Sequence, residues 1–399
     1  MSGIKIIIPF LLLLAGIMAC NKDANQPKTL DCNLESPLYQ TSLKSNEYQS
    51  LINQYRAKGL PGINLLVHDS TGYFIGSTGT ADIENNLPMQ PCHVQHYAGV
   101  TQMMTAVAVF RLQEKGLLSI DDLVSKYIPS NTLKKISNGD SPLKIKNLMN
   151  HTSGFYDLFS NEQFDFDLIN NPTAQKNAAQ LLEYVYNQPS LFAFRPADTV
   201  GFSNTNYLML SMIMESVTGM SASKVINDEI VVPLSLNETY CFPYQKPPST
   251  SLAKSYYDLY GNNTLHNLSD WNTGFGNGYN GVFSTVWDMH TFIEALFISK
   301  SLLQSSSLEQ MLQFEPDVEK GKQMGIGCFR DFMDASNPAN KFSWGYRGND
   351  LAATAEVHYF PESKTTLVVA LNYGTAKVSS LRYTYDEFRR RLAAIVTED

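Results

Sequence analysis

The stretch Tyr97-Ala98-Gly99-Val100-Thr101-Gln102-Met103-Met104-Thr105-Ala106 begins the helix around which the rest of the chain is expected to fold. Val100, Met103, Met104 and Val107 share one helical face, and Gly116 marks the end of this pattern. Helical patterns dominate the segment that follows, whereas strand patterns occur near the two ends of the chain. This order predicts an α+β fold whose antiparallel sheet is built from both chain ends, with an all-helical lobe inserted between them.

The strand and helix patterns place these two lobes along the chain. An α/β lobe is expected at 46–98 and 320–397, and the helical lobe at 99–319. Together they form one domain, because neither end can complete the sheet alone. Strands are expected at 63–67, 73–76, 355–360 and 366–371, and further helices at 48–55, 145–149, 178–185, 207–217 and 290–297.

The first residues resemble the leader of a bacterial lipoprotein. Lys5 precedes an apolar stretch at 6–19 that is too short for a membrane span and typical of a signal peptide. The leader ends in Ile17-Met18-Ala19-Cys20, which is similar to a lipobox and implies cleavage before Cys20 and lipid on its sulfur. We therefore expect a signal peptide at 1–19, a lipidated tether at 20–45, and a location in the bacterial cell envelope, at the outer membrane, the cell surface or the periplasm. An ordinary secretory signal is the alternative.

The charge of the chain bears on its binding partners, and its cysteines bear on possible disulfides. The formal net charge is −8 and no run of Lys and Arg occurs, so nucleic acid is not expected as a partner, and the membrane is reached through the lipid. Cys32, Cys92, Cys241 and Cys328 allow three disulfide connectivities, and buried free thiols are an equal alternative. No His, Asp or Glu cluster has the spacing of metal ligands, so neither a metal nor a cofactor is expected.

Five short motifs in order resemble the serine β-lactamase and penicillin-binding-protein superfamily, in its class C and esterase-like branch. They are Gly59-Leu60-Pro61-Gly62, the segment 76–86, Leu148-Met149-Asn150-His151-Thr152-Ser153-Gly154, Phe202-Ser203-Asn204-Thr205-Asn206-Tyr207 and Gly281-Val282-Phe283-Ser284-Thr285. The resemblance implies a β-lactamase/transpeptidase-like fold and acyl-transfer chemistry. A Ser on the central helix attacks a carbonyl, a Lys one turn later assists it, and a Tyr moves the proton.

The reactive groups of that family are missing from the matching positions. Gly99 stands where the Ser should be, Gln102 where the Lys should be, and Phe202 where the Tyr should be. Tyr346-Arg347-Gly348 stands where the family has His or Lys, then Thr or Ser, then Gly, so only Gly348 fits. Since losing one such group costs on the order of 10⁶ in turnover, the sequence predicts an inactive homologue.

We expect this inactive homologue to bind a ligand or partner at the former active-site cleft, and an active serine-type hydrolase is the alternative. An active hydrolase would need another nucleophile, and Thr101, Thr105 and Ser203 are the candidates, with His96 as a nearby assistant.

A binding site would use the polar residues that remain, and a peptide or an acidic small molecule is the expected ligand. Arg347 is expected to clamp a carboxylate, or else to pair with Asp350 or face solvent. The ligand-binding candidates are Gln102, Asn204, Asn280, Tyr346 and Arg347.

Two histidines are expected to be structural. The resemblance places His151 in a turn that ends a helix, and His358 lies within a strand pattern, where it is expected to pack across strands.

Overall fold

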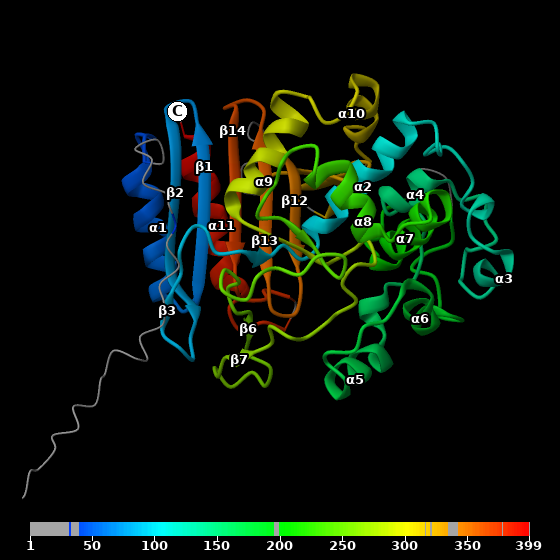
Figure 1. The fold of residues 1–399 in the computed structure, drawn as a ribbon, viewed down its shortest axis with the longest axis horizontal. Coiled ribbons are helices and arrows are strands. Elements are labelled where there is room, and N and C mark those ends of the chain that lie inside the picture. The colour runs from blue at the N-terminus through cyan, green and yellow to red at the C-terminus, as the bar shows by residue number, and fades with distance from the viewer. Residues whose placement is uncertain are drawn as a thin grey trace, which may run out of the picture.

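A computed structural model of the chain describes residues 32, 40–194, 199–315, 317–319, 321–333, 342–376 and 378–398. A twisted sheet and its covering helices form one side of the molecule, and a mainly helical lobe forms the other (Figure 1). The predicted leader, its lipobox Cys20 and most of the predicted tether lie outside the described residues. No described helix is long and apolar enough to cross a bilayer.

Both ends of the chain build the sheet, as the sequence predicts. In the described residues its strand order is β3-β2-β1-β14-β13-β12-β11-β10-β9, and neighbours run antiparallel. Ile63 of β1 lies opposite Leu371 of β14 at the junction of the two chain ends. The strands are β1 (Gly62–Asp69), β2 (Gly72–Asp82), β3 (Leu87–Pro88), β9 (Asp317–Glu319), β10 (Lys322–Met324), β11 (Phe329–Asp331), β12 (Ser343–Asn349), β13 (Thr354–Phe360) and β14 (Thr365–Leu371).

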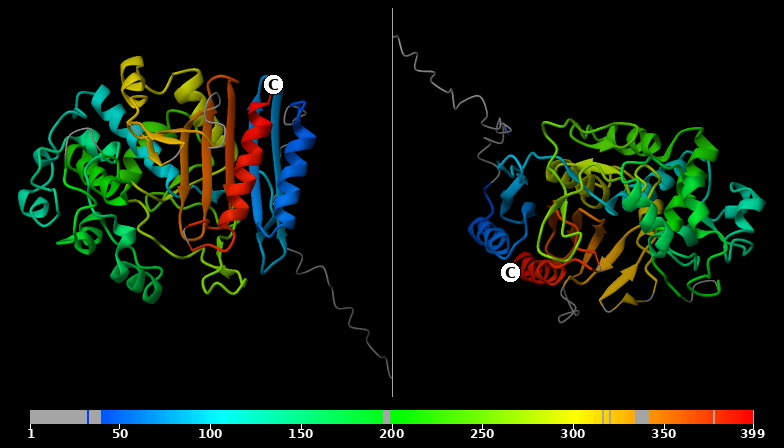
Figure 2. Two further views of the ribbon diagram at one scale, coloured as in Figure 1. Left: turned by 180° about the vertical axis from the view of Figure 1, so that it is seen from behind. Right: turned by 90° about the horizontal axis from the view of Figure 1, so that it is seen from below.

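Helices cover both faces of this sheet, which explains why β14 is buried along its whole length. The helices α1 (Ser45–Ala57) and α11 (Arg382–Thr397) lie side by side on one face (Figure 2). On the other face α9 (Val286–Ile293), continued by η7 (Glu294–Ile298), packs against β1, β13 and β14. The predicted helical lobe at 99–319 therefore returns to the sheet near its end.

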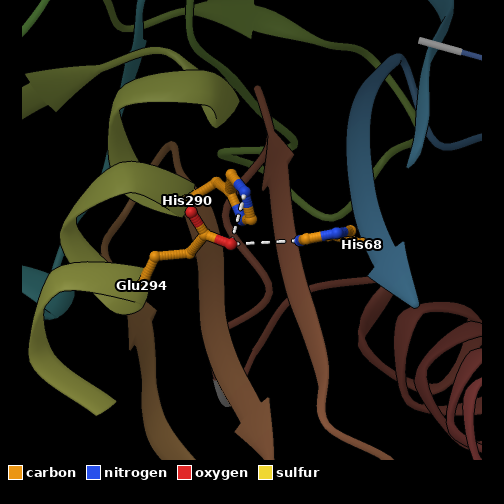
Figure 3. Close-up of side chains that lie close together, drawn as sticks. All are labelled: His68, His290 and Glu294. Atoms are coloured by element: carbon orange, nitrogen blue, oxygen red, sulfur yellow. Dashed lines mark hydrogen bonds and ion pairs between the residues drawn. The ribbon is translucent and has the colours of Figure 1, made fainter. Parts of the chain in front are cut away.

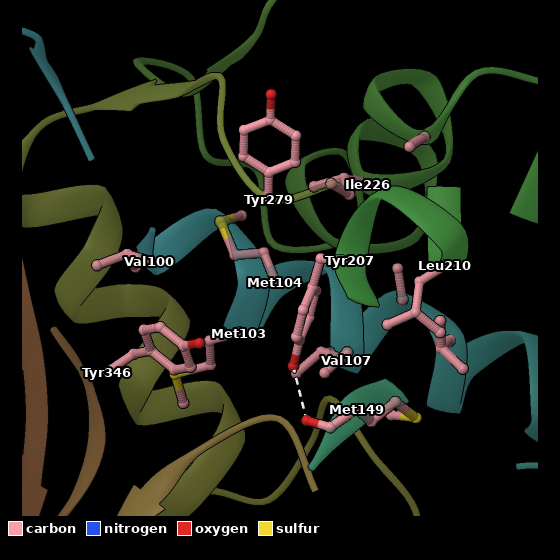
Figure 4. Close-up of a cluster of buried hydrophobic side chains, with 14 of the residues drawn as sticks. Val100, Met103, Met104, Val107, Met149, Tyr207, Leu210, Ile226, Tyr279 and Tyr346 are labelled. Carbon is pink, nitrogen blue, oxygen red and sulfur yellow. Dashed lines mark hydrogen bonds between the residues drawn. The ribbon is translucent and has the colours of Figure 1, made fainter. Parts of the chain in front are cut away.

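Helix α2 (Val100–Glu114) runs through the centre of the molecule. Twelve of its fifteen residues are buried, so it is enclosed on all sides rather than amphipathic. Val100, Met103, Met104 and Val107 pack in this core, and the Tyr207 hydroxyl donates to the Met149 carbonyl at 3.0 Å beside them (Figure 4). This is the helix that the opening motif predicts.

The inserted lobe surrounds α2 with short elements. It was expected to be wholly helical, and the structure adds short strands that line its boundary with the sheet. Its helices are η3 (Val124–Lys126), α3 (Ser130–Leu133), α4 (Ile145–Met149), η4 (Leu158–Ser160), α5 (Glu162–Asn170), α6 (Ala178–Leu182), η5 (Glu183–Val185), α7 (Asn204–Thr218), α8 (Ala222–Ile226), η6 (Asn227–Val231) and α10 (Ser305–Met311). The short strands are β4 (Gln95–His96), β5 (Tyr240–Cys241), β6 (Tyr256–Tyr257), β7 (His266–Asn267) and β8 (Val282–Ser284).

The cysteines divide into one bridge and two thiols. A disulfide joins Cys32 to Cys92, which lie 60 residues apart, while Cys241 and Cys328 are buried free thiols. The sequence had left the pairing open, because the spacing of the cysteines does not reveal which of them meet in space.

Candidate functional site at the start of helix α2

Strand β12 approaches the beginning of α2 so closely that it needs glycine there. A Cβ on Gly348 would lie 2.5 Å from the Gly99 nitrogen and 2.6 Å from the Val100 nitrogen, closer than real Cβ atoms come. Gly99 itself is the residue before the helix, with φ −65°, and a Cβ there would meet the Gly348 Cα at 3.3 Å. The motifs of α2 and β12 are thus brought together, as the family pattern implies.

Three buried side chains and the partly buried Asp157 form a hydrogen-bond chain beside this contact. The Tyr346 hydroxyl donates to Gln102 Oε1 at 2.7 Å, and Gln102 Nε2 donates to Asn204 Oδ1 at 2.9 Å. Asn204 in turn donates from Nδ2 to Asp157 Oδ1 at 3.0 Å and from its backbone nitrogen at 2.8 Å. The candidates Gln102, Asn204 and Tyr346 therefore meet, although they come from α2, α7 and β12.

In this set of hydrogen bonds each buried polar group has a partner, as is usual in a protein core. Gln102 is fully buried and both atoms of its amide are used, and an amide does not titrate in the range where a lysine would. Burial raises the pKa of the Tyr346 hydroxyl well above its usual value, so the phenol stays protonated and acts as a donor. Neither group can serve as a general base near neutral pH.

Phe202 lies at the edge of the site rather than inside it. Its ring is 42% exposed and stands 4.5 Å from the His151 ring, centre to centre. His151 is buried with φ 57°, and its Nδ1 accepts from the Ser203 nitrogen at 3.2 Å and from Asn206 Nδ2 at 3.0 Å. Burial lowers its pKa to about 3, so it is neutral and structural, as expected.

The proposed replacement nucleophiles are all engaged with the backbone. Thr101 Oγ1 accepts from the Val282 nitrogen at 3.2 Å, and Thr105 Oγ1 donates to the Gly278 carbonyl at 2.6 Å. Ser203 Oγ donates to the Tyr156 carbonyl at 3.1 Å and is fully buried. None of these hydroxyls is directed at an open site by its hydrogen bonds.

Arg347 does not join the other candidates at this site, although the sequence analysis grouped it with them. Successive strand residues point to opposite faces, so Tyr346 faces α2 whereas Arg347 faces α11. There Arg347 Nη2 donates to Asp386 Oδ1 at 3.1 Å, and its Nε lies 3.6 Å from Glu356 Oε1. The expected alternative partner, Asp350, is not the one it meets. The same alternation places His358 in the interior, where its Nε2 lies 2.8 Å from Glu356 Oε2 and its Nδ1 lies 3.0 Å from Ser343 Oγ across the strands.

Asn280 belongs to a second polar cluster, two of whose members lie close in sequence to Gly99 and Gly348. His96 Nε2 donates to Asn280 Oδ1 at 2.6 Å, and Asn280 Nδ2 donates to Asp350 Oδ2 at 2.6 Å. Thr273 Oγ1 and the Leu351 nitrogen also donate to Asp350, at 2.6 and 2.7 Å. His96 comes three residues before Gly99 and Asp350 two residues after Gly348, so the cluster flanks the same meeting point.

Asp350 faces a small recess that sequence reasoning did not find. Trp271, Phe275 and Phe283 give it aromatic walls, and Ser255 and Ser269 add hydroxyls. Burial lowers the pKa of His96, so the ring is neutral near pH 7 and the described partners of Asp350 carry no formal charge. In the sequence, this recess is indicated only by the position of Asp350 two residues after Gly348.

The fold and the convergence of these motifs define a β-lactamase/transpeptidase-like protein. The sequence matches the Beta-lactamase family over residues 48–389, and the chain belongs to that family. It is 27% identical over 216 residues to a putative D-alanyl-D-alanine carboxypeptidase of Escherichia coli O157:H7, covering 50% of this chain and 48% of that protein. It is 26% identical over 191 residues to a penicillin-binding protein of Bacillus subtilis, covering 47% of this chain and 38% of that one. The chain thus spans about half or less of the length of these curated relatives.

Solved structures give the same fold. The D-amino acid amidase from Ochrobactrum anthropi superposes with a TM-score of 0.75 at 20% identity, covering 89% of this chain and 98% of that one. A penicillin-binding protein from Bacillus halodurans superposes with a TM-score of 0.71 at 20% identity, covering 87% and 98%. At this identity the likeness supports the fold.

Replacing Tyr346 by Phe tests the hydrogen-bond chain. The change leaves the Gln102 oxygen buried without its donor, so we expect the free energy of unfolding to fall by about 1–3 kcal/mol in urea titrations. Tyr97→Phe is the matched control, because Tyr97 is equally buried and its hydroxyl has no hydrogen-bond partner. The control should change the free energy of unfolding little. Equal losses in both variants would show that the hydrogen bonds of Tyr346 add nothing to stability.

Proposed function

We propose that this protein is a non-hydrolytic member of the serine hydrolase family, which keeps the fold and binds a ligand beside the former active site. The observation that carries the proposal is the chain Tyr346–Gln102–Asn204–Asp157, which occupies the positions of the family's base and its neighbours with mutually satisfied groups. An active hydrolase with another nucleophile is the competing function, and the backbone hydrogen bonds of Thr101, Thr105 and Ser203 speak against it.

Acyl transfer lacks a group at each of its steps. Gly99 has no oxygen to form an acyl-enzyme, and Gln102 cannot take the proton that such an attack releases. Phe202 lacks the phenolic oxygen that would pass the proton to the leaving group. Because catalytic groups of this kind act as a unit, removing the first already costs on the order of 10⁶ in turnover, about 8 kcal/mol of barrier.

The recess in front of Asp350 is the ligand site that we propose. Its carboxylate is held by neutral donors, so a cationic group can add a charge-assisted hydrogen bond. Trp271, Phe275 and Phe283 line the recess, which has room for a small group such as the ammonium of a ligand, whose remainder would lie outside it. Relatives named as a D-alanyl-D-alanine carboxypeptidase and a D-amino acid amidase point to amino-acid or peptide ligands. We infer an amino-acid amide or short peptide with a free amine, rather than an acidic ligand, since Arg347 faces the other side of the sheet.

We also propose that the protein is exported and held in the cell envelope by a lipid on Cys20. The support is the leader with its lipobox-like end, together with the Cys32–Cys92 disulfide, which suits an oxidising compartment. In cells that process lipoproteins, the unaltered chain should partition into the detergent phase of a Triton X-114 extract, and Cys20→Ala should move it to the aqueous phase. Equal partitioning of both chains would argue against lipidation.

A covalent fluorescent penicillin tests the loss of acyl transfer. The unaltered protein should remain unlabelled, whereas the triple change Gly99→Ser, Gln102→Lys and Phe202→Tyr should restore labelling. The φ of Gly99 is helical and allows a serine, but the new Cβ would lie 3.3 Å from the Gly348 Cα, so β12 must shift by a few tenths of an ångström.

A fourth change, Tyr346→His, removes the hydroxyl that now bonds Gln102 and serves as a second restored variant. Stoichiometric labelling of the unaltered protein would overturn the proposal. Silence of both restored variants would show that the missing side chains alone do not explain the loss.

Titration with D-phenylalanine amide and with D-alanyl-D-alanine, followed by calorimetry and Trp fluorescence, tests the recess. Asp350→Asn should weaken binding by about 10- to 100-fold, the value of one hydrogen bond to a charged group. Asp270→Asn is the control, since Asp270 is an exposed carboxylate next to Trp271 and should leave binding unchanged. Binding that survives Asp350→Asn, or no binding of either compound, would contradict this site.

A further inference from the structure

Three side chains that the sequence analysis did not connect lie together on the α9 side of the sheet. His68 of β1 faces His290 of α9 and Glu294, the first residue of η7 (Figure 3). Their ligand atoms all lie within 4.8 Å of one another. The expectation that no cluster has metal-ligand spacing is therefore wrong. His290 and Glu294 stand four residues apart on one helical face, which was a readable signal, but His68 lies more than 200 residues away in sequence.

We propose that His68, His290 and Glu294 bind a divalent transition-metal cation, with zinc as the reference ion. The His68 Nδ1 to Glu294 Oε1 distance is 3.1 Å, and the His290 Nε2 to Glu294 Oε1 distance is 3.5 Å. Ligand atoms about 2.0–2.1 Å from a tetrahedral zinc lie roughly 3.3 Å apart, so both edges already fit. The ligand nitrogens of the two histidines lie within 4.8 Å of each other, and they would have to come closer to complete three corners of the tetrahedron.

The ring of His290 is already oriented for this role. Its Nδ1 lies 2.9 Å from Thr366 Oγ1, an outer contact that fixes the ring as second-shell partners do for metal-bound histidines. Its Nε2 is buried, makes no hydrogen bond to any residue that the structure describes, and lies 3.5 Å from Glu294 Oε1. Only 1% of the residue is exposed, and burial lowers its pKa to about 4, so the nitrogen carries a lone pair near neutral pH. The 3.5 Å contact with Glu294 is too long to satisfy this buried nitrogen as a hydrogen bond would, and a metal ion would satisfy it.

The ring of His68 is held from its other side. Tyr73 stacks on it with ring centres 3.8 Å apart and an angle of 9° between the planes. The side chains of His68 and Glu294 remain 31% and 35% exposed, so an ion can enter from solvent and keep a water as its fourth ligand. Two nitrogens and one carboxylate oxygen select zinc, copper or nickel over magnesium and calcium, which prefer oxygen ligands.

The position of the cluster indicates what the ion would do. It joins β1 to α9, and thus the beginning of the chain to the end of the inserted lobe. These ligands come from neither the α2–α7–β12 site nor the recess at Asp350, so the inference is independent of the proposed function. A ligand that binds only the folded state stabilises it in proportion to the logarithm of its concentration over its dissociation constant. We therefore assign the ion a structural role that clamps α9 to the sheet.

Calorimetric titration of the chelator-treated full chain with zinc chloride tests the site, with cobalt absorption as the second readout. One ion per chain should bind, a tetrahedral cobalt spectrum should appear, and the unfolding temperature should rise with zinc but not with magnesium. Glu294→Gln and His290→Gln should each weaken zinc binding at least tenfold and remove the cobalt spectrum.

Matched controls are Glu309→Gln, an exposed carboxylate, and His266→Gln, a partly exposed histidine away from the cluster. Both should bind zinc as the unaltered chain does. A third readout covers variants of low stability: copper should quench the fluorescence of Trp287, whose ring centre lies 5.7 Å from that of His290, and Trp287→Phe should abolish that quenching. Absence of stoichiometric zinc binding, or equal losses in the controls and the cluster variants, would overturn the proposal and leave Glu294 as a hydrogen-bond partner of His68 that lies close to His290.

Discussion

Helix α2 is buried on every side from Val100 to Phe110, and this enclosure constrains the elements around it. Each polar side chain on a buried helix must find its partner inside the protein, because an unsatisfied polar group there costs about 1–3 kcal/mol. Thr101, Thr105 and Gln102 all meet this requirement through neighbours from other elements. The elements that supply those partners are thereby held in register with the start of the helix.

The hydrogen-bond chain at the start of α2 follows from this constraint. In a family that depends on a serine and a lysine at the start of this helix, a chain with Gly99 and Gln102 must replace a charged, reactive arrangement by a neutral one. Tyr346 and Asn204 supply the donor and the acceptor that Gln102 needs. The residues at these three motifs therefore depend on one another. Gly348 is retained for a different reason: the backbone of β12 still touches the first amides of α2.

The sequence predicts features that depend on local patterns better than contacts between segments that lie far apart in the chain. The sheet built from both chain ends follows from the order of strand and helix patterns. The meeting of Gln102, Asn204 and Tyr346 follows from the resemblance of their motifs to those of the family. The direction of Arg347 was missed because it depends on which strand face looks toward α2. Asp350 and the cluster of His68, His290 and Glu294 were missed because their partners come from distant segments. The pairing of Cys32 with Cys92 is likewise a property of the folded chain.

The antiparallel pairing of β1 with β14 also governs the order in which the molecule can form. Ile63 and Leu371 are separated by about three hundred residues, so one of the central ladders of the sheet closes a very long loop. Helices of the inserted lobe make shorter-range contacts and can collapse around α2 earlier. The β1–β2 hairpin must wait with an unpaired edge until the last strand has been synthesised and delivered, and such an edge is open to pairing with other chains. Assembly is therefore slowest, and aggregation most probable, where the two ends of the polypeptide meet.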